Sequence, residues 1–480
     1  MPKAKTPSFV LELPLQASTK QDRIMWFRME AGRRIYNAVL VQSLKRLARL
    51  RASTDWSSAF KLENKKAKNK AFSEAYKKHQ FTEYALHDLA GNIRKSGGFA
   101  DRIGSHETQK IATRVWNALD QYRFGGRGKP RFKGINRPLH SLEGKENTAC
   151  VRFQKETGLL YWGKMTLSVK TPDTTYVSES LKSKTKFCRI VWRNIKGQRR
   201  WFVQLIQQGE APSRYDFLAS GNEVGLDIGP STIAIVSECG VGLERFAPSV
   251  DQPWKQIKLI QRKMARSQKA TNPNNFNPNG TPKKGARKWV KSSRYLVLQS
   301  QLREIERVLA ARRKTDHGNL ANRVVGLGTV IKTEKLSYSV FQKNFGRSVK
   351  QRAPSAFVDL LNRKAERAGG KLIELNTWKL KMSQFDHTSG LCKKKPLSQR
   401  HHVLHDKTSV VQRDSYSAFL ALNAQGDTHN LSQLNESWAT VESLLRRARL
   451  CVNELASGKV PTFPAVAIPS ELIARHRVLG

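Results

Sequence analysis

The sequence predicts a multidomain α+β protein in which a helical segment is inserted into a β-barrel and an α/β domain follows. The 480 residues suffice for about three domains. Helical periodicity dominates from about residue 20 to 125, and short strands bounded by turn residues dominate from about 150 to 207. After residue 221, apolar strands are separated by long helical patterns, which is typical of an α/β sheet.

Positive charge is the strongest compositional signal. Lys and Arg total 86 against 38 Asp and Glu, which gives a formal net charge of +48. Such an excess attracts polyanions and releases their counterions on binding. Nucleic acid is therefore the expected partner, with a ribosome-associated or non-specifically basic protein as the alternative.

Other function classes find little support. No stretch approaches the roughly 18 to 20 uninterrupted apolar residues of a membrane span, and the first residues lack the features of a secretory signal. The five cysteines are scattered and contain no CxxC pair, so they predict neither a disulfide framework nor a standard zinc site. We expect a prokaryotic, cytoplasmic and nucleoid-associated protein with no membrane partner.

The first half divides at a glycine-rich break from Gly125 to Gly134. Before it, helical patterns run from Ile24 to Leu50 and from Ile111 to Tyr122, separated by a Lys-rich run that is either a solvated or a phosphate-contacting helical face. After it, the clearest hairpin joins 187–195 to 200–207 around Lys196-Gly197-Gln198. A short strand-like piece near the N-terminus would join the same barrel.

In the second half, Ala211 to Gly221 reads as a linker, and the strands 224–228 and 231–237 follow it. A charged helical hairpin is expected over 252–327, then a strand from Thr329 to Glu334, a basic loop, a helix from Ala356 to Ala368 and a strand over 371–375. A late helix begins at Asp414.

Three carboxylates occupy notable places in this pattern. Asp227 lies inside an apolar strand, Glu334 ends a later strand, and Asp414 begins the late helix. An RNase H-like fold would bring such positions to one edge of a mixed sheet, where they could hold two Mg²⁺ ions about 3.5–4 Å apart. Mn²⁺ would suit the same oxygen ligands. The alternative for Asp227 is a residue that caps a turn.

Four strings together resemble the transposon-encoded TnpB nucleases and the compact Cas12 (type V) effectors, a family of RNA-guided RuvC nucleases. They are 224–236, 331–349, 393–400 and 412–421, and the strings 31–40 and 128–134 fit the same family. The resemblance covers about residues 20 to 425. It implies that Asp227, Glu334 and Asp414 are the three RuvC acids.

The resemblance further implies a guide RNA, a target double-stranded DNA with a short adjacent motif, and a displaced single strand that reaches the RuvC site. Candidate nucleic-acid contacts in the matched strings are Arg33, Arg34, Tyr36, Asn37, Lys129, Arg131, Lys133, Lys343, Arg347 and Arg413. The implied domains are a first wedge strand (1–20), a helical recognition lobe (21–124), a β-barrel wedge domain (125–212), the RuvC nuclease domain (221–382), a degenerate zinc-ribbon loop that would contact target nucleic acid (383–411), the end of RuvC (412–425) and a C-terminal extension (426–480).

The chain departs from the family in that loop, where the family carries four zinc-binding cysteines. Only Cys392 is present, and the other donors nearby are His387, His401, His402 and His405. Because structural zinc needs four such ligands, we expect that it has been lost, with an irregular site as the alternative.

Two further functions stay open. A guide-directed DNA-binding protein could repress without cutting, although the intact acid trio argues against it. A protein-only nuclease or transposase of the same fold would not need a basic segment of about 220 residues before its nuclease half. The sequence does not distinguish a transposon-encoded protein from a CRISPR-linked one.

Overall fold

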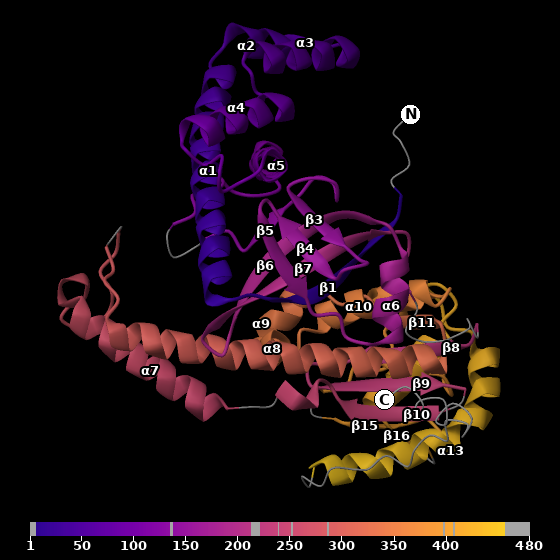
Figure 1. The fold of residues 1–480 in the computed structure, drawn as a ribbon. Coiled ribbons are helices and arrows are strands. Elements are labelled where there is room, and N and C mark those ends of the chain that lie inside the picture. Colours follow the sequence, from indigo (N-terminus) through magenta and orange to yellow (C-terminus); the bar gives the residue numbers. More distant parts are fainter. Residues whose placement is uncertain are drawn as a thin grey trace. The chain divides into compact units, whose positions relative to one another are not determined.

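The computed structural model describes residues 6–134, 138–212, 221–238, 240–250, 253–285, 288–396, 399–406 and 409–456, the last eleven by backbone alone. Most of the expected linker and the tail after residue 456 lie outside the described residues. The chain is a mixed α and β protein that divides into two compact units, Met1–Arg214 and Tyr215–Gly480 (Figure 1).

The first unit combines a helical segment with a seven-stranded antiparallel sheet. Its helices are α1 (Thr19–Arg51), α2 (Thr54–Lys61), α3 (Lys65–Lys78), α4 (Glu83–Ser96), α5 (Ser105–Arg123) and α6 (Thr175–Lys182). Its strands are β1 (Ser8–Gln16), β2 (Ser141–Glu143), β3 (Val151–Gln154), β4 (Leu159–Trp162), β5 (Met165–Val169), β6 (Thr185–Ile195) and β7 (Gln198–Gln208). The expected helical insert between a first strand and a β-rich segment is therefore present, and α6 is an element that the sequence pattern did not reveal.

The sheet of this unit is nearly closed. Its order is β2-β6-β7-β1-β5-β4-β3, and the edge strand β3 returns to contact β6. In β1 every second residue is buried, so Phe9, Leu11, Leu13 and Leu15 face the core. The predicted hairpin is confirmed as β6 and β7, joined by Lys196 and Gly197, whose positive φ angles suit a two-residue turn.

Buried polar bonds attach the helices to this sheet. Trp162 on β4 donates its indole N–H to Glu107 on α5 at 2.6 Å, while Arg28 on α1 donates to the Trp162 carbonyl at 2.6 Å. The Arg28 guanidinium also lies 4.7 Å from the centre of the Trp162 ring. These bonds join α1 and α5 to the barrel, and the apolar core is continuous through both.

The second unit is built on a five-stranded mixed sheet. Its strands are β8 (Glu223–Ile228), β9 (Thr232–Ser237), β10 (Gly240–Arg245), β11 (Val330–Glu334) and β12 (Lys371–Leu375), in the order β10-β9-β8-β11-β12. The pairs β8–β9 and β9–β10 are antiparallel, whereas β11 is parallel to both β8 and β12. The third strand, β10, was not expected from the sequence, because its two glycines and its charges hide the alternation.

Helices cover both faces of this sheet, and short elements complete the unit. The helices are α7 (Trp254–Thr271), α8 (Ser293–Leu327), α9 (Tyr338–Arg352), α10 (Pro354–Arg367), α11 (Thr377–Leu380), α12 (Arg413–Leu422) and α13 (Leu431–Ala456), with 3-10 turns at Pro248–Val250 and Pro273–Asn275. Two short hairpins pair β13 (Phe385–Asp386) with β14 (Leu391–Cys392) and β15 (His401–Val403) with β16 (Val410–Gln412). The predicted helical hairpin is confirmed as α7 and α8, which lie side by side (Figure 1).

The prediction of a basic loop after Glu334 is wrong, because most of this segment forms helix α9. This helix has a kink at Phe345, where φ is −127°, and Gly346 follows. Gly346 inside this segment lowers its helix propensity, which is why the sequence pattern favoured a loop. The segment therefore presents its basic residues on a helix rather than on a loop.

Alternation along the strands divides the core of the second unit into two layers. Val224, Leu226 and Ile228 on β8 pack with residues of α8 and α10. Gly225 and Asp227 point to the opposite face, where α12 lies. Asp227 therefore lies on the face of the sheet that α12 covers.

Candidate functional site

The parallel pairing of β8 and β11 brings Asp227 and Glu334 side by side. The register pairs Lys332 with Gly225 and Thr333 with Leu226, so Glu334 follows opposite Asp227. Paired residues on adjacent strands point to the same face and lie about 5 Å apart between backbones. Both carboxylates therefore belong to the carboxyl end of their strands and to the face that α12 covers.

Gly225 allows α12 to approach this face closely. A Cβ atom at residue 225 would lie 2.1 Å from the Ala418 carbonyl oxygen and 2.5 Å from the Leu422 backbone nitrogen. Asp227 is two residues further along β8, and Asp414 is one turn before Ala418 in α12. The helix therefore runs back over β8, and its first turn, with Asp414, lies above the end of β8 that carries Asp227.

Lys332 fixes the other end of α12. Its side chain is largely buried, and its ammonium donates to the carbonyl oxygens of Leu422 at 2.9 Å and Ala424 at 3.2 Å. It also pairs with Glu223 at 2.6 Å. A cation at these last carbonyls satisfies acceptors that the helix leaves open and stabilises its C-terminal dipole. Lys332 thus ties α12 to the same strand that carries Glu334.

The electrostatics of the trio show that the three acids are close. Burial raises the pKa of Asp227 well above its usual range, and the charges of Glu334 and Asp414 raise it further, against an opposite effect from Arg413. Burial raises the pKa of Glu334 to about 7. Arg413 lies 3.4 Å from Asp414 through its Nε atom. The structure therefore gathers all three predicted acids, and Arg413, in one place.

The side chains of Asp227, Glu334 and Asp414 are not arranged as a ready metal-binding site. Within the described ranges, no group of three or more His, Cys, Asp or Glu side chains is arranged to hold a metal ion. The donor chemistry nevertheless suits a hard divalent cation, because oxygen ligands converge where burial and mutual repulsion disfavour their charges. Side-chain rotation would have to bring the carboxylates together around an ion.

Helix α9 connects to the turn that follows Asp227. Ser348 donates its hydroxyl to the Pro230 carbonyl, and Arg352 donates to Ser348 at 2.8 Å and to the Phe246 carbonyl at 2.8 Å. The predicted contact residues Lys343 and Arg347 are exposed on this helix, and the Arg347 guanidinium lies 5.0 Å from the centre of the Trp254 ring. Two basic side chains are thus carried on a helix anchored beside the acids.

The remaining predicted contact residues lie in the first unit. Arg33 and Asn37 donate to the Lys133 carbonyl at 2.7 and 2.8 Å, while Asn37 also accepts from the Lys133 backbone N–H at 2.8 Å. Arg33 and Arg34 pair with Glu30, and the Lys133 ammonium lies 5.6 Å from the centre of the buried Tyr36 ring. Lys129 and Arg131 are exposed. Arg33, Tyr36, Asn37 and Lys133 therefore support the loop that ends at Gly134, and their role in nucleic-acid binding stays a prediction.

In the segment 383–411, which was expected to be a degenerate zinc-ribbon loop, the structure has a polar cluster around Asp386. The Asp386 carboxylate accepts from the His405 backbone N–H at 3.0 Å and lies 3.6 Å from His402, whose ring contacts the Lys395 ammonium. Burial and the nearby Lys395 lower the pKa of His402 to about 4. Burial lowers the pKa of His387, and its Nδ1 atom lies 2.7 Å from the Tyr416 hydroxyl. Cys392 is exposed on β14.

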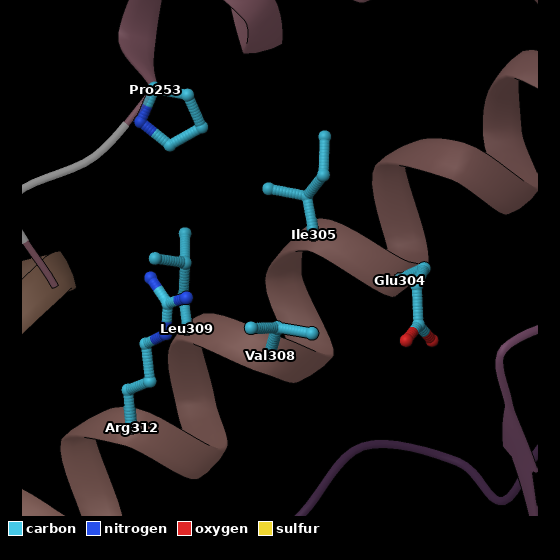
Figure 2. A pocket seen from close by; sticks show the side chains of 6 residues that line it. All are labelled: Pro253, Glu304, Ile305, Val308, Leu309 and Arg312. Atoms are coloured by element: carbon cyan, nitrogen blue, oxygen red, sulfur yellow. The ribbon is translucent and has the colours of Figure 1, made fainter. Parts of the chain in front are cut away.

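A hollow of about 190 Å³ lies along α8, and none of the three acids lines it. Figure 2 shows its lining. It is lined by Pro253, Glu304, Ile305, Val308, Leu309 and Arg312. Its one carboxylate, Glu304, pairs with Arg307 at 2.7 Å, so the hollow lacks converging polar groups for catalysis. No helix within the described ranges combines the length and apolar character needed to cross a bilayer.

Comparison with known proteins gives distant structural likenesses. No model of a protein family matches the chain, and no curated protein matches it. A Cas12f1–sgRNA–target DNA complex is similar with a TM-score of 0.42 and 10% identity, covering 87% of this chain and 98% of that one. A CRISPR-Cas12f ternary complex has a TM-score of 0.28 and 11% identity, covering 85% and 83%. A Cas12i–crRNA–dsDNA complex has a TM-score of 0.25 and 10% identity, covering 87% and 66%.

Proposed function

We propose that this protein is an RNA-guided DNA endonuclease of the RuvC type, with Asp227, Glu334 and Asp414 as its catalytic metal ligands. The observation that carries the proposal is the meeting of these acids at the carboxyl edge of the sheet, under the first turn of α12. If the five strands β8 to β12 are numbered 1 to 5 along the chain, their order across the sheet is 3-2-1-4-5. Strand 2 is antiparallel to strand 1. This topology supports an RNase H-like fold.

The residues of the site would each have a defined task. Asp227 and Glu334 supply carboxylate oxygens from neighbouring strands, and Asp414 supplies a third from the helix. Two bound Mg²⁺ or Mn²⁺ ions would supply a lower pKa for the attacking water and positive charge beside the scissile phosphate. Arg413 adds a positive charge next to Asp414 and would pair with a phosphate oxygen of the bound DNA.

Guidance by RNA is supported by the architecture outside the acid site. The net charge of +48 is larger than binding of a short DNA substrate alone would require. The first unit also combines a basic helical segment with a nearly closed sheet. We propose that this unit holds a guide RNA and its paired target strand, and that the displaced DNA strand enters the acid site. Base pairing would then select the sequence, and the protein would read only a short adjacent duplex motif.

The first test is sequencing of the RNA that co-purifies when the gene is expressed with its flanking DNA. The proposal predicts one discrete species with a constant scaffold and a variable end of about 20 nucleotides. An RNA that maps to the gene's own flank would indicate a transposon-encoded protein, and one that maps to a repeat–spacer array would indicate a CRISPR-linked protein. Heterogeneous RNA, or none, would contradict guidance.

A further inference from the structure

Trp378 is unusually exposed for a tryptophan. At 88% relative exposure it is the most exposed large hydrophobic side chain within the described ranges. Single exposed apolar residues are common on protein surfaces, so exposure alone assigns no role. The position of Trp378 in the fold, close to the acid site, is what suggests a role.

Trp378 lies at the same sheet edge as the acid trio. The parallel register pairs Glu334 with Leu375, and the ladder continues as the Lys335 backbone N–H donates to the Leu375 carbonyl at 2.9 Å. Trp378 is three residues after Leu375, a distance that an extended chain covers in about 10 Å. With about 5 Å between strands, its backbone is within roughly 15 Å of that of Glu334.

The backbone that carries Trp378 is held in place. The Asn376 side chain accepts from the Trp378 backbone N–H at 3.1 Å, and Thr377 donates its hydroxyl to the Lys335 carbonyl at 3.1 Å. Leu380 is buried, and its carbonyl accepts from His429 at 2.7 Å. An aromatic ring on a fixed backbone loses little conformational freedom when a flat ligand stacks on it.

Three lysines lie near Trp378 along the backbone. Lys381 is exposed three residues after it, and Lys335 is exposed on the residue whose carbonyl accepts from Thr377. The adjacent Lys379 pairs with Asp427 at 2.8 Å at a solvent-exposed position. A solvent-exposed ion pair of this kind is weak, so Lys379 can leave Asp427 for another anionic group. An aromatic face beside positive charges is the arrangement by which proteins bind single-stranded nucleic acid without reading its sequence.

We infer that Trp378 is a stacking platform for a base of the single-stranded DNA that enters the acid site. The inference rests on the proposed function and names a residue that would orient the strand before cutting. At about 3.4 Å per nucleotide, the span of roughly 15 Å between the backbones of Trp378 and Glu334 corresponds to about four nucleotides, so the stacked base would lie within several nucleotides of the scissile phosphate. Because every base has an aromatic face, the contact would be tolerant of sequence.

The test measures binding apart from cleavage. Full-length protein with Asp227→Ala is titrated in EDTA against a fluorescein-labelled single-stranded DNA of about 20 nucleotides, with and without Trp378→Ala. The affinity should fall about 5- to 150-fold, the range for loss of one stacked base at about 1–3 kcal/mol. Trp378→Phe should recover most of it, since a phenyl ring still stacks. Val297→Ala, which removes a 58%-exposed apolar side chain on α8 of the same unit, is the matched control and should leave the affinity unchanged.

Salt dependence separates stacking from charge. Trp378→Ala should leave the slope of log affinity against log salt unchanged, whereas Lys335→Ala should lower its magnitude by about 0.7 if it contacts a phosphate. Affinity within 2-fold of the parent for Trp378→Ala would overturn the inference, and so would a loss seen only with an RNA oligonucleotide of the same sequence.

Failure of the inference and failure of the proposed function give different results. If the wild-type protein cuts DNA, Asp227→Ala does not, and Trp378→Ala binds and cuts normally, only the inference is overturned. If no preparation cuts DNA but Trp378→Ala still loses oligonucleotide affinity, the stacking site stands and the nuclease proposal falls.

Discussion

Replacement of Glu334 by glutamine should stabilise the metal-free protein at alkaline pH. Burial raises the pKa of Glu334 from 4.5 to about 7, so the folded protein binds this proton more tightly than the unfolded chain does. The free energy of unfolding therefore falls as the pH rises from about 4.5 through about 7, because the folded state must give up a proton that it binds preferentially. Glutamine carries no charge at any pH and avoids this loss.

The size of the effect follows from the pKa difference. The shift from 4.5 to about 7 corresponds to about 3 kcal/mol at about 1.4 kcal/mol per pKa unit. At pH 8 in EDTA, Glu334→Gln should exceed wild type by up to about 3 kcal/mol, which is about 6–12 °C in the melting temperature of a domain of this size. At pH 4 the two proteins should melt at nearly the same temperature.

Differential scanning calorimetry at pH 4 and pH 8 measures this difference directly. The matched control is Glu306→Gln on the exposed side of α8, which should shift the melting temperature by less than about 2 °C at either pH. Added Mg²⁺ should stabilise wild type more than Glu334→Gln, because a ligand has been removed. Equal melting temperatures for Glu334→Gln and wild type at pH 8 in EDTA would refute the assignment of Glu334 as a buried, destabilised acid.

Three further substitutions test the site. Asp227→Ala should abolish cleavage while RNA and target binding stay near wild type in electrophoretic mobility shifts, since it removes a metal ligand and no phosphate contact. Lys332→Met should lower the free energy of unfolding by about 1–3 kcal/mol and slow cleavage, because the last carbonyls of α12 lose their donor. Gly225→Ala should cost about 1–3 kcal/mol in urea unfolding and slow cleavage, because the new methyl group would force α12 away from β8.

Each of these has an outcome that would count against it. Cleavage by Asp227→Ala at the wild-type rate would remove that residue from the site. Unchanged cleavage in Lys332→Met or Gly225→Ala, with the expected loss of stability, would show that the position of α12 does not control the reaction.

The sequence predicted the elements that carry the acids better than it predicted how they meet. Strand periodicity located β8 and β11, and the apolar segment after Asp414 located α12. Their convergence depends on contacts that no local pattern contains, namely the parallel register of β8 with β11 and the close packing of α12 on Gly225. The pattern alone was weak evidence for grouping the three acids, because any of the 38 acidic residues could have been chosen, and the resemblance to a known family decided the assignment.

Sequence reasoning missed Lys332 and Trp378, although each had a weak signal. Lys332 is a charged residue in an apolar strand, two positions before Glu334 and therefore on the same face. Gly225 holds the corresponding place two residues before Asp227, and a glycine inside a strand often marks a close approach of another backbone. Trp378 gave no pattern at all, because exposure of a single aromatic residue is a property of the folded surface.

The most direct test of the account is cleavage of a DNA matched to the co-purified RNA. Wild-type protein and Asp227→Ala, each purified with its RNA, are incubated with that duplex in Mg²⁺ and with a duplex of scrambled sequence. The account predicts that wild type cuts only the matched DNA, and that Asp227→Ala binds the matched DNA equally well but leaves it intact. Cutting that ignores the RNA sequence, or equal cutting by Asp227→Ala, would contradict it.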